Sequence, residues 1–215
     1  MSKIKLPHAS GNSMSIGAPA TNPASDLELK LPATIGTAGQ YLTVDGSGNL
    51  TWADPPGITS ADLWRQSEDK TSNQNPIDAW ERVDTTTNSF SQGFIGSGMS
   101  ESSGVFSFPS TGIWLVQFNA CAHTADEENY FEAIIGMSGD NGSNWDNMAY
   151  GYGNHYNDSS NVYTSATTWT TVDVTNTSTQ KVKFSIYWDS GANDVVMGSS
   201  TNSYTQVLFI RLGAT

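Results

Sequence analysis

A run of tyrosines alternating with glycine and amide residues offers the clearest binding chemistry in this sequence. The run is Tyr150-Gly151-Tyr152-Gly153-Asn154-His155-Tyr156-Asn157-Asp158. Aromatic rings pack on the apolar faces of sugars, and amide and carboxylate groups hydrogen-bond to hydroxyls. The candidate glycan-binding residues are therefore Tyr150, Tyr152, Asn154 and Tyr156. The end of a strand followed by an irregular loop, packed at a subunit interface, explains the same residues, so both interpretations stay open.

An acidic run forms the second candidate site. Hard cations such as Ca²⁺ bind several carboxylate oxygens, and three consecutive acids supply them. These candidate calcium ligands are Asp126, Glu127 and Glu128. A solvated acidic loop between two strands is the competing interpretation. Asp140, Asn144 and Asp146 resemble part of a calcium loop but lack its bidentate Glu, so we interpret them as a hairpin turn.

Catalytic chemistry has little support in the sequence. His8, His123 and His155 are scattered and form no pair at helical or zinc-finger spacing. Cys121 ends an apolar strand, with His123 two residues away on the same side, and we expect Cys121 to pack as a small apolar group. No carboxylate pair is marked for glycoside hydrolysis, which needs two carboxyl groups roughly 5–10 Å apart. We therefore expect a protein that is not an enzyme.

The composition indicates a folded all-β protein with an acidic surface. The 215 residues include 21 Asp and Glu against nine Lys and Arg, with 11% aromatic residues and 20 glycines. Many aromatic and few charged residues argue against disorder, and such a glycine-rich, polar composition is typical of β proteins with many turns. The acidic balance disfavours nucleic acid as a partner, because phosphate binding needs clustered Lys and Arg.

Neither membrane insertion nor secretion is predicted. No apolar run reaches the roughly 20 residues that span a bilayer, and no apolar leader segment follows Met1–Pro7. A single cysteine also rules out an internal disulfide. These features predict a chain made in a reducing cytoplasm.

Two regions of different composition meet near Gly57. Six prolines in the first 57 positions disfavour a long helix or a central strand there. Tyr41–Val44 and Leu50–Trp52 flank a glycine-rich turn and predict a small hairpin, which needs a neighbour because isolated hairpins are marginally stable. Seventeen of the acidic and six of the basic residues lie beyond residue 60, so the second region carries most of the negative charge.

The second region has the pattern of short, regularly spaced strands. Along Gly112–Phe118 two apolar-rich sets of side chains alternate, which indicates an inner strand covered on both faces. One set is Trp114, Val116 and Phe118, and the other is Ile113, Leu115 and Gln117. Thr168–Val174 and Lys181–Trp188 are further predicted strands, and Asn141-Gly142 marks a hairpin turn. About eight to ten strands in about 155 residues favour a sandwich or barrel.

Residues 61–215 resemble the C1q/TNF-like jelly rolls. Gly104–Phe118 follows their pattern G-x-Y/F-x-F-x-x-x-G-x-Y/W-x-V-x-F, and Ser203–Ile210 is similar to their last strand. Gln206-Val207 differs from the small residue or glycine that is usual there. The resemblance implies an antiparallel jelly-roll sandwich that assembles as a homotrimer.

The N-terminal region resembles virion proteins of tailed phages. Leu31–Trp52 is similar to a cassette common in tail fibres and other virion proteins, and Lys5–Asn12 resembles the start of structural proteins of marine, often cyanobacterial, phages. Such proteins attach to the particle by the N-terminus and present a C-terminal head. The resemblance implies an extended attachment arm over residues 1–35, a short hairpin stem and linker over 36–60, and a jelly-roll head over 61–215.

We therefore expect a structural component of a tailed-phage virion, either a short tail fibre or spike or a head-decoration protein. Its expected partners are two identical copies and other virion proteins, with no nucleic acid and no cofactor other than the candidate Ca²⁺. A receptor-binding tip that recognises host surface glycans is the alternative. The candidate attachment residues of the arm are Ile4, Leu6, Pro7, Ile16, Leu29 and Leu31.

Overall fold

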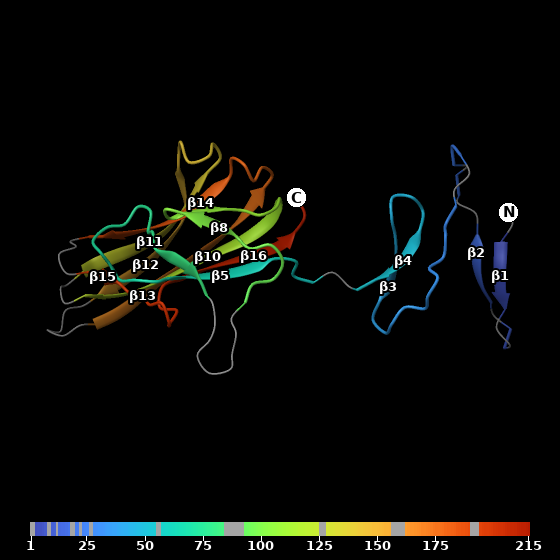
Figure 1. The fold of residues 1–215 in the computed structure, drawn as a ribbon, viewed down its shortest axis with the longest axis horizontal. Helices are drawn as coiled ribbons and strands as arrows, with labels where there is room; N and C mark the ends of the chain where they lie inside the picture. Colours follow the sequence, from blue (N-terminus) through green and yellow to red (C-terminus); the bar gives the residue numbers. More distant parts are fainter. Residues whose placement is uncertain are drawn as a thin grey trace. The chain divides into compact units, whose positions relative to one another are not determined.

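The structure, a computed structural model, describes eleven stretches of the chain. They are residues 3–7, 10–11, 13–17, 20–21, 23–25, 28–54, 57–83, 93–124, 128–155, 162–189 and 194–215. These stretches contain strands and turns and no helix. The chain divides into two units, Met1–Pro56 and Gly57–Thr215 (Figure 1), and each is described by itself.

One sheet of the second unit, called the inner sheet here, is built around a long central strand. Its strands are β5 (Ala61–Gln66), β6 (Lys70–Thr71), β7 (Trp80–Arg82), β10 (Gly112–Thr124), β13 (Val162–Val174), β15 (Val195–Val196) and β16 (Gln206–Gly213). β10 pairs along its whole length with β13 on one side. On its other side β10 pairs first with β16 and then with β15. β5 and β6 continue the sheet beyond β16 and β15, and β7 pairs with β5.

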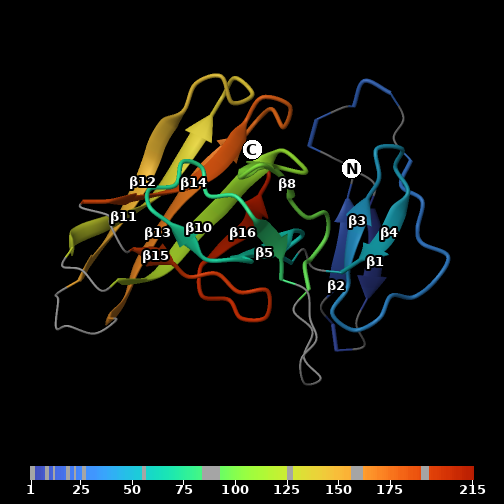
Figure 2. The ribbon, with the colours of Figure 1, turned by 60° about the vertical axis from the view of Figure 1, so that its left-hand side comes forward.

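The second sheet, called the outer sheet, packs against the first. Its strands are β8 (Ser100–Ser102), β9 (Val105–Ser107), β11 (Glu128–Ser138), β12 (Asp146–His155) and β14 (Lys181–Trp188). They lie in the order β12-β11-β14-β9-β8, and Figure 2 shows β12, β11 and β14 side by side. Past the end of β9, Gln74 exchanges two backbone hydrogen bonds with Ile186 of β14. This topology is the antiparallel jelly-roll sandwich that the sequence predicted.

The predicted strand boundaries hold where alternation is strong. Lys181–Trp188 coincides with β14, and Tyr41–Val44 coincides with β3. β10 continues past Phe118 because the small side chains of Ala120 and Ala122 remain fully buried in the core. β13 begins six residues before the predicted Thr168, because its polar first half pairs in register with β10.

A cluster of aromatic rings fills the space between the two sheets. The ring of Phe106 lies at its centre, with ring centroids 5.3 Å from Trp64, 5.9 Å from Trp80, 5.6 Å from Phe184 and 5.2 Å from Phe209. Three of these pairs have edge-to-face geometry, which aromatic quadrupoles favour over face-to-face stacking. Because the rings come from both sheets, this cluster is what holds the sandwich together.

A buried carboxylate ties the start of the inner sheet to its neighbours. Asp62 is 1% exposed and accepts hydrogen bonds from Trp64 Nε1 at 2.9 Å, Met99 N at 2.7 Å and Arg82 Nε at 2.9 Å. The Arg82 guanidinium also lies 4.6 Å from the centre of the Trp64 ring. Charge-assisted bonds of this kind join β5, β7 and the segment before β8.

The described residues of the first unit include two hairpins. β1 (Lys3–Pro7) pairs antiparallel with β2 (Ser13–Gly17), a pairing that the sequence analysis did not predict. β3 (Tyr41–Val44) and β4 (Leu50–Ala53) form the predicted hairpin. Lys30 extends the edge of this hairpin through two backbone hydrogen bonds. The Lys30 N–H donates to the carbonyl oxygen of Gly48, and the Leu50 N–H donates to the carbonyl oxygen of Lys30.

We expect Phe106→Ala to lower the free energy of unfolding by about 3–5 kcal/mol, because it removes the ring that four other aromatic side chains contact. Chemical denaturation of the whole chain measures the change. Phe94→Ala is the matched control, since the Phe94 ring is half-exposed and contacts the Arg82 guanidinium at 4.7 Å. The control should lose about 1 kcal/mol or less, and equal losses in the two variants would refute the central role of Phe106.

Candidate functional site

The tyrosine run lies on the solvent-facing side of the outer sheet. Along β12 the side chains alternate, so Tyr150, Tyr152 and Asn154 are exposed while Gly151 and Gly153 face the interior. The rings of Tyr150 and Tyr152 are stacked, with centroids 6.3 Å apart and planes within 8°. The structure thus brings three of the candidate glycan residues to one face, whereas the fourth, at position 156, lies outside the described residues.

The two glycines of the run have a packing role. A Cβ at Gly151 would lie 2.6 Å from the carbonyl oxygen of Thr167 on β13, and one at Gly153 would lie 2.1 Å from Cε1 of Phe131. Only glycine lets β12 approach β13 and the Phe131 ring this closely. The alternation of rings and glycines therefore reflects close packing inside and exposed tyrosines outside.

Neighbouring strands add residues that the sequence analysis missed. In the strand register, Glu132 of β11 is opposite Tyr152 on one side and Tyr187 of β14 on the other. Tyr130, two residues before Glu132, places its ring edge-to-face with Tyr152 at 6.1 Å. We call the set Tyr130, Glu132, Ile134, Tyr150, Tyr152 and Tyr187 the tyrosine face.

A pocket of about 450 Å³ opens at the tyrosine face. It is lined by residues 73–75, Glu132, Ile134, Asn147, Tyr150 and residues 185–187. Hydrogen bonds hold its rim. Trp188 N donates to Asn73 Oδ1 at 2.7 Å, Ser185 Oγ donates to Asn75 Oδ1 at 3.0 Å, and Asn147 Nδ2 donates to the Tyr150 hydroxyl at 3.0 Å. Several side chains at the boundary of the pocket are therefore held in place before any ligand arrives.

The electrostatics of the tyrosine face are negative. Partial desolvation, followed by the charge of Glu132, raises the pKa of the Tyr152 hydroxyl. Desolvation and the charges of Asp189 and Glu132 likewise raise the pKa of Tyr130. Both phenols are therefore neutral hydrogen-bonding groups at neutral pH, and Glu132 is the one acidic residue among the described residues that line the pocket.

The calcium prediction stays a prediction. Asp126 and Glu127 lie outside the described residues, and Glu128 begins β11 in register with His155. Within the described stretches, no group of three or more His, Cys, Asp or Glu residues is placed to hold a metal ion.

Asp140 forms the hairpin turn inferred from the sequence. Its carboxylate accepts bonds from Asn144 N at 2.9 Å, Asn144 Nδ2 at 2.6 Å and Ser138 Oγ at 2.8 Å. The same turn recurs in the first unit, where Asp45 accepts bonds from Asn49 N at 2.9 Å and Asn49 Nδ2 at 2.7 Å. Bonds to the ionised form lower the pKa of Asp140 to about 2 and also lower that of Asp45.

Cys121 and His123 share a side of β10, as expected, but they make no catalytic pair. The Cys121 sulfur lies 3.8 Å from the Met197 sulfur, and burial raises the pKa of its thiol. A nucleophilic cysteine needs a lowered pKa instead. The His123 ring packs edge-on against Tyr163 at 5.7 Å. Cys121 is half-buried rather than buried, because it lies on the uncovered side of the inner sheet.

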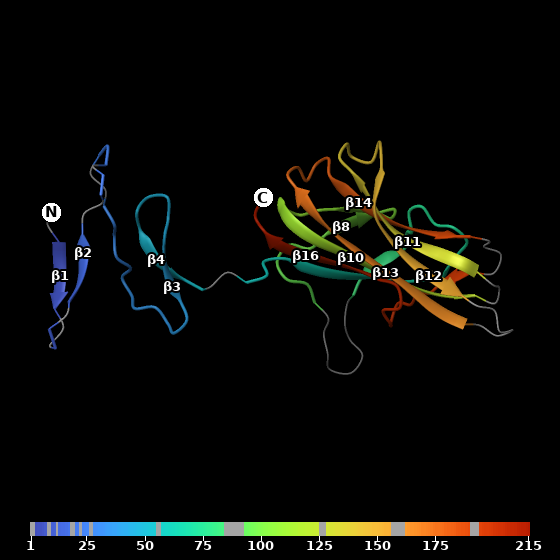
Figure 3. The same ribbon diagram turned by 180° about the vertical axis from the view of Figure 1, so that it is seen from behind.

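That uncovered side of the inner sheet is rich in apolar residues. Trp114, Val116 and Phe118 point inward and are fully buried, as predicted, whereas the alternate set on β10 is half-exposed. Two neighbouring rows cross the sheet in register, Leu63–Leu208–Gln117–Trp169 and Ala61–Ile210–Leu115–Thr171. Figure 3 shows β16, β10 and β13 from behind, turned by 180° from the view of Figure 1. We call Leu63, Leu115, Trp169, Leu208 and Ile210 the inner-sheet face. The coverage predicted for both sides of β10 is present on one side only among the described residues.

The candidate attachment residues lie in the first unit. Ile4, Leu6 and Pro7 belong to β1, and Ile16 to β2. Leu29 and Leu31 are exposed, Leu31 by 79%. Nothing in these positions tests their role in attachment.

Comparisons with known proteins identify the fold of the second unit. Murine APRIL at pH 5.0 superposes with a TM-score of 0.51 at 13% identity, over 71% of this chain and 98% of that chain. Eiger TNF from S. frugiperda superposes with a TM-score of 0.51 at 10% identity, over 72% and 93%. Both support a TNF-like jelly roll. No family model matches the sequence, and no curated protein matches it significantly.

None of the described residues forms a helix long and apolar enough to cross a bilayer.

We expect the Asp140 carboxylate to titrate at a pH of about 2. Since this pKa lies below the ordinary 3.8, the turn contributes its full stability above about pH 4 and loses it as the pH falls through about 2. Carboxyl-carbon NMR measures the midpoint. Asn144→Ala, which removes the Nδ2 bond and keeps the backbone bond, should raise it. A midpoint near 3.8 in the unaltered chain would contradict the geometry.

Proposed function

We propose that the protein is a homotrimeric structural component of a tailed-phage virion, displayed by its jelly-roll head and attached through its N-terminal region. The uncovered inner-sheet face carries the proposal. It spans four strands of a rigid sheet, and three of its five residues are leucines. Monomeric proteins rarely expose contiguous apolar patches beyond a few hundred Å².

Two further copies of the chain are the occupants that fit this face. Burying apolar surface contributes about 25 cal/mol per Å², and obligate interfaces bury ~2,000 Å² or more. Trp169 is 66% exposed on the edge strand β13. It is therefore placed to contact one neighbouring subunit, while the leucines of the inner-sheet face pack against another. The C1q/TNF-like resemblance of the sequence implies threefold assembly.

The small first unit supports a multimeric stem. Its second hairpin exposes Tyr41, Leu42 and Val44, and the adjoining segment exposes Leu31 and Ile35. A module of this size with so much apolar surface gains stability from packing on identical modules or on the particle. Three attached arms on one trimer also raise the effective concentration at the particle and slow release.

The phage assignment is supported by the sequence resemblance of Leu31–Trp52 and Lys5–Asn12. The fold comparisons concern the head alone. A role without catalysis belongs to the same proposal. Recognition of host glycans is the second candidate function, and the tyrosine face is the observation that favours it.

We expect the protein to sediment and scatter light at three times its 23.1 kDa chain mass at micromolar concentration. Leu208→Asp places a charge in the middle of the inner-sheet face and should yield monomers that keep their β-sheet circular dichroism. Met148→Asp is the matched control on the outer sheet, where Met148 is exposed, and should stay trimeric. A monomeric unaltered chain would overturn the proposal.

Deleting residues 1–30 should leave a folded, trimeric head that no longer joins particles, because the head unit Gly57–Thr215 has its own core. Purified particles from cells that express the truncated chain, probed by immunoblot, measure incorporation. Full incorporation of the truncated chain would show that the arm does not mediate attachment.

A further inference from the structure

We propose that the pocket at the tyrosine face is a binding site for an uncharged saccharide, with tyrosine rings as its walls and Glu132 as its central acceptor. The proposal rests on the second candidate function above, glycan recognition, and gives it a site and a ligand class; it does not depend on the structural role in a virion. The site lies on the outer sheet, whereas the trimer is proposed to form through the inner sheet. Assembly would therefore leave the pocket accessible.

The shape of the pocket fits one sugar ring. Tyr150 of β12 and Tyr187 of β14 stand on either side of β11 and are 46% and 44% exposed. Strands two positions apart in a sheet are separated by about 10 Å, so the two tyrosines stand on either side of a shallow space over β11 into which the pocket opens. Ile134 lies between these walls in register with Tyr150 and Ser185 and forms an apolar floor. Rings that remain half-exposed above an apolar floor provide the surface on which C–H faces of a sugar pack.

Polar groups surround the apolar floor formed by Ile134. Glu132 lies between the strands that carry Tyr152 and Tyr187, and a carboxylate accepts bonds from two adjacent hydroxyls. On the opposite rim, the amide oxygens of Asn73 and Asn75 accept bonds from Trp188 N and Ser185 Oγ. Both residues line the pocket, and each amide also carries an Nδ2 group that can donate to a ligand. A ring with hydroxyls around its edge matches this combination of acceptors and donors.

The charge of the site selects among ligands. Among the described residues no Lys or Arg lines the pocket, and Glu132 lies in it, so phosphates, nucleic acids and acidic sugars are disfavoured. A single acidic residue is too few for a Ca²⁺ site, which takes six to eight oxygen ligands. Amide and carboxylate groups around the floor disfavour an apolar peptide, because such groups would be buried without partners. An uncharged saccharide satisfies every group.

The rim is organised before binding. Asn73 and Asn75 are held to β14 by the bonds above, and Asn147 is held to the Tyr150 hydroxyl. Preorganised groups lose little side-chain entropy when a ligand arrives. Small ligands of this size gain limited affinity, so we expect a monosaccharide Kd on the order of 1 mM.

Saturation-transfer NMR on the full-length protein tests the proposal with glucose, galactose, mannose and N-acetylglucosamine, and with glucuronate as the acidic counterpart. We expect at least one neutral sugar to bind and glucuronate to bind at least tenfold more weakly. Tyr187→Ala and Glu132→Ala should each weaken binding at least tenfold, and Glu132→Gln should weaken it less than Glu132→Ala.

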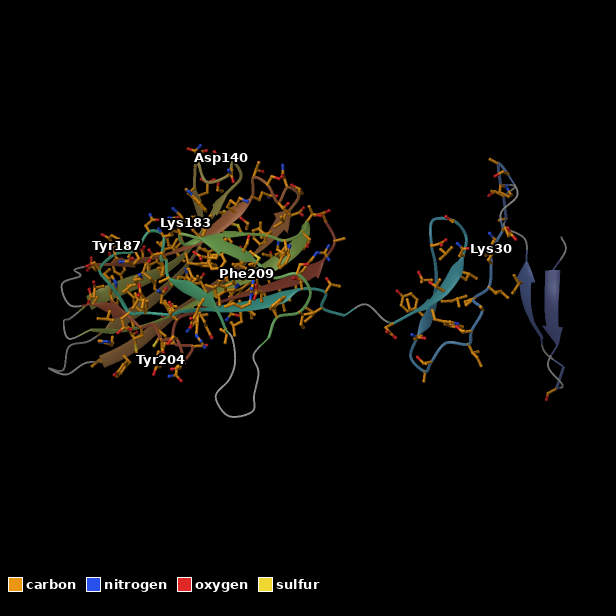
Figure 4. All side chains as sticks on the ribbon, in the orientation of Figure 1. Lys30, Asp140, Lys183, Tyr187, Tyr204 and Phe209 are labelled. Carbon is orange, nitrogen blue, oxygen red and sulfur yellow. The ribbon has the colours of Figure 1, made fainter. Side chains whose placement is uncertain are left out.

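Tyr204→Ala is the matched control. Tyr204 is 40% exposed, close to the value for Tyr187, and Figure 4 shows the two tyrosines on well-separated parts of the head. This variant should bind as the unaltered chain does. No binding of any neutral sugar, equal binding of glucuronate, or unchanged binding by Tyr187→Ala would overturn the proposal.

Light scattering on the same samples separates this result from the trimer proposal, because sugar binding to a monomer refutes only trimerisation. An unfolding midpoint for each variant shows that lost binding is not lost folding. Binding that disappears without a change in midpoint supports the site, and binding that is unchanged in either Tyr187→Ala or Glu132→Ala refutes it.

Discussion

Edge-to-face packing of aromatic rings around Phe106 is the interaction on which the head depends. The rings come from both sheets, so the distance between the sheets and their relative placement follow from it. Once the inward set is buried, the period of two along each strand decides what faces outward. On β10 this leaves apolar residues such as Leu115, and on β12 it leaves Tyr150 and Tyr152. Two chemically different surfaces therefore result from one core.

These two surfaces lie on opposite sides of the sandwich, which would separate the proposed self-association from the proposed recognition. The inner-sheet face is apolar and formed by residues from four strands. The tyrosine face carries rings, amides and one carboxylate around a pocket. If the same face served both self-association and ligand binding, trimer formation would cover the binding site. Here a trimer would present three copies of the pocket outward, and weak individual binding would become avid on a repetitive surface.

Much of the fold could be predicted because the relevant signals are local. The alternation in Lys181–Trp188 and the turn residues after Val44 specify a strand and a hairpin from short-range preferences alone. The first half of β13 could not be predicted, since its polar residues form a strand through pairing with β10. Only part of the candidate site could be predicted from the sequence, for the same reason. Tyr150 and Tyr152 are neighbours in sequence, whereas Glu132 and Tyr187 join them only through strand register, and Asn73–Asn75 only through a loop along β14.

The twin aspartate turns at Asp45–Asn49 and Asp140–Asn144 bear on the order in which the chain folds. Each closes a loop of a few residues with bonds that need no distant partner, so the entropy of closure is small. The first turn emerges from the ribosome long before the second, and its hairpin can close while the head is still being synthesised. Within the head, β11 and β12 can pair, starting from the turn that joins them, before β10 pairs with β13 and β16. Local turns and hairpins can therefore form during synthesis, before the slower, long-range strand pairing that assembles the sandwich.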